Sequence, residues 1–118
     1  MKDEDEGTLD FAGALGELQG LIGRRVSVES GPEGAGPFHE SRGVLERSMD
    51  LQITSGWPLD RPARVAFFLA HADAQFVVRE SGFLIALAYT LELPEGPSRT
   101  VQLHYVGGAV LIVREELD

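Results

Sequence analysis

The chain has 118 residues, of which 43% are apolar, and it contains no cysteine. This length suits a single domain, and this apolar fraction is sufficient for a hydrophobic core. The lack of cysteine excludes a disulfide scaffold, a thiolate zinc site and a cysteine nucleophile. Nineteen acidic residues against ten basic ones give a net charge of −9. Because this charge repels nucleic acid and anionic lipid, we expect the chain to bind neither.

The N-terminal segment differs in composition from the rest of the chain. Residues 1–7 carry five charges and, after the initiator, no apolar side chain. We predict a disordered acidic tail over residues 1–7 and a single globular domain over residues 8–118. The tail is acidic where a secretion signal is basic and then apolar, and no apolar run approaches the ~18 residues of a membrane span. We therefore expect a cytoplasmic protein without membrane contact.

A helix is predicted directly after this tail, because apolar residues recur there at steps of four, three and four. These residues are Phe11, Leu15, Leu18 and Ile22. Thr8 or Asp10 can accept a hydrogen bond from the first turn, and Gly23 suits the left-handed position that ends a helix.

The rest of the chain indicates antiparallel strands separated by turns. The expected strands cover residues 24–29, 44–53, 64–70, 75–80, 83–93, 100–105 and 109–114. Gly107 and Gly108 predict a two-residue type I′ turn, in which both central residues need positive φ. The predicted fold is mainly β, with the N-terminal helix followed by six to seven antiparallel strands in a small barrel or a strongly bent sheet. Because Asp60 could cap a helix with Pro62 in its first turn, an α+β fold with a second helix near 61–72 is the alternative.

Three segments resemble parts of the Sm/LSm-like barrels. Residues 21–28 look like the transition from the helix to the first strand of that family. Residues 43–53 are similar to the first Sm motif, with Asp50 where the family has its RNA-contacting asparagine. Residues 105–108 resemble the second motif, with Val106 in place of the family's arginine. The resemblance implies a small barrel that begins with a helix, and no RNA-contacting residue is carried over to this chain.

The sequence contains no motif that assigns a reaction. It has no G-x-S-x-G elbow and no phosphate loop with its Lys-Ser/Thr pair, so we assign no catalytic, cofactor-binding or metal residue. We expect a non-enzymatic interaction or assembly module without a cofactor. The alternative is a small metal-dependent enzyme or ligand-binding β-barrel that uses His71, Asp73 and His104, a donor set suited to first-row metals. Glu115 and Glu116 are interpreted as a solvated C-terminal end.

Trp57 is the aromatic residue with two open interpretations. It lies between Gly56 and Pro58 and is followed by Arg61 and Arg64. It can cap one end of the barrel, with its indole N–H bonded to a carbonyl. It can also be a surface anchor for a protein partner, because aromatic residues beside arginines are typical of such contacts.

Two predicted strands are apolar on both faces, which indicates self-association. In 64–70, Val65, Phe67 and Leu69 alternate with Ala66, Phe68 and Ala70, and 83–88 repeats this pattern. A one-layer antiparallel sheet buries only one face, and one short helix covers too little of the other. We therefore predict a homodimer formed through a two-fold contact. The alternative is that a closed sheet and the helix cover both faces within one chain.

Overall fold

The computed structural model describes residues 8–32, 39–50, 63–70 and 74–117. Over these residues the chain forms one helix and eight strands, which confirms the mainly β class with an N-terminal helix. The elements are β1 (Thr8–Leu9), α1 (Phe11–Gln19), β2 (Arg25–Pro32), β3 (His39–Asp50), β4 (Arg64–Ala70), β5 (Ala74–Arg79), β6 (Phe83–Leu93), β7 (Gly96–Tyr105) and β8 (Ala109–Glu115). None of the described helical residues forms a helix long and apolar enough to cross a membrane.

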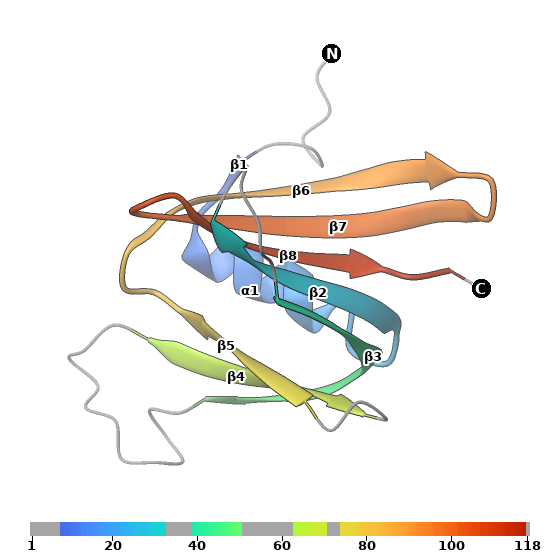
Figure 1. Cartoon of the computed structure of the whole chain (residues 1–118), viewed down its shortest axis with the longest axis horizontal. Coiled ribbons are helices and arrows are strands. Elements are labelled where there is room, and N and C mark those ends of the chain that lie inside the picture. Colours follow the sequence, from blue (N-terminus) through green and yellow to red (C-terminus); the bar gives the residue numbers. More distant parts are fainter. Residues whose placement is uncertain (1–7, 33–38, 51–62, 71–73, 118) are drawn as a thin grey trace.

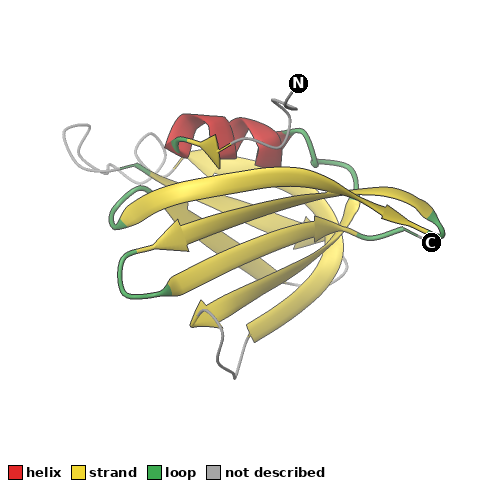
Figure 2. Cartoon of the chain, turned by 90° about the horizontal axis from the view of Figure 1, so that it is seen from above, coloured by secondary structure: helices red, strands yellow, loops and turns green. Residues whose placement is uncertain are grey.

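The strands form one antiparallel sheet in the order β1-β6-β7-β8-β2-β3-β4-β5. Strands β1 and β5 end this sheet and do not pair with each other, so of the two predicted forms, a small barrel or a strongly bent sheet, the chain has the bent sheet. The sheet bends so that β3, β4 and β5 lie opposite β6, β7 and β8 (Figure 1). Helix α1 lies against β1, β6 and β7 and covers one side of the bend (Figure 2).

Two sequence-based expectations need correction. Over the described residues the sheet has eight strands rather than six or seven, because β1 has only two residues and is too short to show alternation. The segment 64–70 is strand β4, as predicted, and pairs with β3 on one side and with β5 on the other, which excludes the alternative of a helix there. Strands β2 and β3 also extend into the stretch expected to be a loop, where Ser30 pairs with His39.

The helix begins as predicted but ends earlier. The Asp10 carboxylate caps the first turn by accepting from the Gly13 N–H at 2.8 Å. Helix α1 ends at Gln19, and Gly23 has the left-handed conformation, with a φ of 94°. Leu21 then packs into the core from the turn, whereas Ile22 is 37% exposed.

The core lies inside the bend of the sheet, and α1 supplies part of it. Its fully buried members come from α1 and from the inner faces of most strands, and they include Leu18, Val26, Leu45, Phe67, Val78, Val101, Leu103 and Val113. The alternation predicted for 64–70 is confirmed on the inner face, where Val65, Phe67 and Leu69 are buried. The second face of β4 is partly covered within the chain, because the Arg47 guanidinium lies 4.3 Å from the centroid of the Phe68 ring.

The β7–β8 hairpin lies where the two glycines predicted it. Gly107 and Gly108 have φ values of 89° and 87°. The Gly108 N–H donates to the Tyr105 carbonyl at 3.2 Å, so Val106 and Gly107 are the central residues of the turn. The connection therefore has three residues rather than two, and the second glycine returns the chain to the sheet.

Candidate functional site

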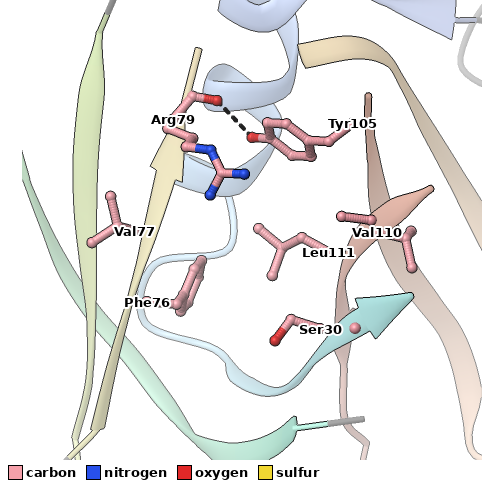
Figure 3. A pocket seen from close by; sticks show the side chains of 9 residues that line it. Ser30, Phe76, Val77, Arg79, Tyr105, Val110 and Leu111 are labelled. Atoms are coloured by element: carbon pink, nitrogen blue, oxygen red, sulfur yellow. Dashed lines mark hydrogen bonds between the residues drawn. The ribbon is translucent and has the colours of Figure 1, made fainter. Parts of the chain in front are cut away.

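An opening lies between the edge strand β5 and strands β7, β8 and β2 (Figure 3). Its volume is about 250 Å³, and it is lined by Ser30, Gly31, Phe76, Val77, Arg79, Tyr105, Ala109, Val110 and Leu111. Small-molecule sites usually measure roughly 300–1,000 Å³, so this opening suits a small group. It exists because the sheet does not close at β5.

Tyr105 connects the two sides of this opening. It is the last residue of β7, and its hydroxyl donates to the Arg79 carbonyl of β5 at 2.7 Å. The Tyr105 ring packs edge-on against Phe83, with the ring centroids 6.0 Å apart, and the residue is 7% exposed. A side chain thus holds β5 beside β7 where the two strands do not pair.

Burial also changes the acidity of this tyrosine. Loss of solvent raises the pKa of the Tyr105 hydroxyl above its ordinary value of 10.0, and the positive charge of Arg79 opposes this rise with a smaller effect. The hydroxyl is therefore neutral near pH 7 and keeps the proton that it donates to the Arg79 carbonyl.

Arg79 provides the charge of the opening. It is the one ionised side chain among the nine lining residues, none of which is acidic. Its guanidinium carbon lies 5.1 Å from the centroid of the Tyr105 ring, in a cation–π contact. Within the described part of the chain, Arg24, Arg42, Arg47 and Arg99 form ion pairs, and none of these pairs includes Arg79.

The remaining walls are apolar except at one point. Phe76 stacks on Phe67 with a centroid separation of 5.3 Å, which fixes its ring at the wall formed by β5. Leu111 lies between Arg79 and Ser30, and Ser30 lies at the wall opposite Arg79 (Figure 3). The opening therefore presents a cation, an apolar middle and a hydroxyl in sequence.

A second hollow, of about 330 Å³, lies where α1 meets the ends of β7 and β8. Two ion pairs lie among its lining residues. Arg99 contacts Glu17 of α1 at 3.0 Å, and Arg24 contacts Glu115 of β8. Because these carboxylates neutralise the arginines, we interpret this hollow as a joint that anchors α1 to the sheet.

Glu115 differs from the expectation of a solvated end. Its side chain is only 11% exposed, and its carboxylate also accepts from the Arg99 backbone N–H at 3.2 Å. Glu116 is 28% exposed and lies 3.7 Å from Arg42. The expectation is wrong because β8 continues to Glu115 between β7 and β2, so this residue belongs to the sheet.

The described residues do not show His71, Asp73 and His104 lying together, as the metal hypothesis requires. His104 lies on β7, where its register partners are Ile85 and Val110. His71, Asp73 and Trp57 lie outside the described residues. Among residues 8–32, 39–50, 63–70 and 74–117, no group of three or more histidine or carboxylate side chains is placed to hold a metal ion. The metal site stays a prediction.

Sequence reasoning did not single out Arg79 or Tyr105 as site residues. Alternation placed Tyr105 on a half-buried strand, which is correct, and Arg79 lay near the end of a predicted strand. Their meeting depends on the sheet remaining open at β5, and no local pattern carries that information.

Comparison with protein-family models, curated proteins and solved structures finds no match to this chain. The local resemblance to Sm/LSm-like barrels is therefore not accompanied by a family match.

Proposed function

We propose that the chain is a non-enzymatic assembly module whose partner is a second copy of itself, docked along the outer edge of β5. The observation that carries this proposal is the regularity of that edge. β5 ends the sheet, has six residues, contains no proline, and pairs with β4 without a shift in register. Its one charged residue, Arg79, is the last. Bulges, prolines and internal charges are among the means by which proteins block edge strands, and β5 has none of these three.

The other end of the sheet is better protected. β1 covers part of β6, since Thr8 pairs with Leu87 and Leu9 pairs with Ala86. The β6–β7 register also shifts between Phe83 and Ile85, which distorts this end locally. β5 is therefore the more favourable edge for another strand.

Two features of β5 favour a second copy of the same chain. Two β5 edges can pair antiparallel across a two-fold axis, which places the exposed apolar side chain of Val77 in the middle of the contact. The two Arg79 side chains then lie at opposite ends. β4 and β5 contain no acidic residue, although the chain has a net charge of −9, so this contact brings no carboxylates together.

The oligomeric state tests this proposal. Sedimentation velocity of the wild type is expected to show a dimer of twice the 12.8 kDa chain mass. Val77→Lys is expected to give a monomer, because a lysine on an edge strand opposes pairing. Leu84→Lys is the matched control, because Leu84 is 60% exposed but lies on β6. A wild type that stays monomeric at every concentration refutes the proposal. Loss of the dimer only in Leu84→Lys would show that the dimer contact lies at β6 rather than at β5.

We further infer, from charge alone, that this module works without nucleic acid. A net charge of −9 opposes the counterion release that drives binding to phosphates. A salt-dependent gel shift with RNA or DNA would contradict this inference.

A further inference from the structure

We propose that the opening beside β5 is a binding site for a small organic anion, namely a monocarboxylate with a compact aromatic or branched apolar body. This goes beyond self-assembly, because it assigns a ligand to the opening itself. The chain has nineteen acidic and ten basic residues, yet the nine residues around the opening include one arginine and no acid. The opening is thus a local site of positive charge on an acidic protein.

Arg79 is held in place to receive a carboxylate. Its backbone carbonyl accepts from the Tyr105 hydroxyl at 2.7 Å, and its guanidinium lies over the Tyr105 ring at 5.1 Å. These two contacts fix the end of β5 and the direction of the side chain (Figure 3). The planar guanidinium can then donate two parallel hydrogen bonds to one carboxylate. Since the Tyr105 hydroxyl already donates to the carbonyl, the guanidinium is the donor left for the ligand on this wall.

The rest of the opening determines the body of the ligand. Phe76 and Leu111 form an apolar middle, which favours a ring or a branched chain over a polar group. Ser30 lies at the wall opposite Arg79, where its hydroxyl can pair with a polar substituent at the far end of the ligand (Figure 3). A volume of about 250 Å³ limits that body to about one ring.

This site adjoins the proposed dimer contact, because Val77 lines the opening and also lies in the middle of the paired edges. Anion binding depends on the Arg79 guanidinium, whereas strand pairing depends on the backbone edge of β5. Ligand binding is therefore measured by titration and assembly by sedimentation, so that either proposal can fail without the other.

The direct test is a titration of the ¹⁵N-labelled full chain, followed by amide chemical shifts, with benzoate, 4-hydroxybenzoate and the uncharged benzamide. We expect both acids to shift the amides of the residues around the opening, at probe concentrations up to about 10 mM. Benzamide is expected to bind about tenfold more weakly or worse, because it lacks the charge that strengthens hydrogen bonds to guanidinium. 4-Hydroxybenzoate is expected to bind more tightly than benzoate if Ser30 pairs with its hydroxyl.

Two variants locate the site. Arg79→Gln is expected to weaken benzoate binding about tenfold or more. Arg47→Gln is the matched control, because Arg47 also lies over an aromatic ring, at 4.3 Å from Phe68, and does not line the opening. This control is expected to leave the affinity unchanged. Ala109→Leu keeps every charge and narrows the opening, so it is expected to abolish binding while the amide spectrum stays that of a folded chain.

Three results would overturn the proposal. No shift with either acid at about 10 mM would show that the opening takes no such anion. Equal binding of benzamide and benzoate would show that charge is not recognised. Equal losses in Arg79→Gln and Arg47→Gln would show a non-specific effect of removing one positive charge rather than a site at Arg79.

Discussion

The hydroxyl of Tyr105 is expected to stabilise the open side of the sheet. Tyr105→Phe keeps the ring and its packing against Phe83, and it removes the 2.7 Å bond to the Arg79 carbonyl. A single neutral hydrogen bond contributes about 1 kcal/mol to the free energy of unfolding. In a chain of this size, such a loss lowers Tm by about 4 °C. The loss of stability is measured by urea denaturation at pH 7. The amide spectrum of Tyr105→Phe is also expected to show changed chemical shifts at β5.

The same residue predicts a dependence on alkaline pH. Burial raises the folded-state pKa of Tyr105 above the 10.0 of the unfolded chain. Between these two values the folded state holds the phenolic proton more tightly than the unfolded state does. Stability from this group is therefore complete below about pH 10 and falls as the pH rises through the folded pKa. Phenylalanine has no such proton, so the stability difference between wild type and Tyr105→Phe is expected to shrink above about pH 10.

Tyr89→Phe is the matched control for this experiment. It removes the other tyrosine hydroxyl, which donates to Gln102 at 2.9 Å between β6 and β7, away from the opening. Tyr89→Phe is expected to leave the amide chemical shifts of β5 unchanged. A Tyr105→Phe protein as stable as wild type at pH 7, or a stability difference that stays constant through the alkaline range, would refute the reasoning from Tyr105.

Other predictions concern backbone conformation and the joint at α1. Gly16→Ala is expected to stabilise the protein by up to about 1 kcal/mol, because the position is helical and an added Cβ meets no atom within 4 Å. The same change at Gly108, where φ is +87°, is expected to destabilise it by about 1 kcal/mol. Urea denaturation of the two variants should give opposite signs, and equal signs would contradict the assigned conformations. Glu115→Ala is expected to cost about 1–2 kcal/mol, because the carboxylate accepts from Arg24 and from the Arg99 N–H. A loss below about 0.5 kcal/mol would show that this joint adds no more than an exposed ion pair.

Much of the secondary structure follows from local patterns in the sequence. Apolar steps of four, three and four predicted α1, and the Asp10 cap and the left-handed Gly23 are both present. Alternation placed Val101, Leu103 and Tyr105 on one buried face of β7. These features depend on neighbours within a few residues, where side-chain direction repeats at 3.6 residues in a helix and at 2 in a strand. They could therefore be derived without knowledge of the rest of the fold.

The openness of the sheet was decided only by tertiary structure. Whether β5 meets another strand depends on the bend of the whole sheet and on the position of α1 along one side of it. The bend itself is the sum of small twists between neighbouring strands over many residues. The same distant pairing placed Glu115 inside the sheet and brought Arg79 of β5 to Tyr105 of β7. Arg79 and Tyr105 are 26 positions apart in the sequence, so no local periodicity predicts that they meet. The candidate site thus lies where no other described strand pairs with the outer edge of β5, next to a buried tyrosine.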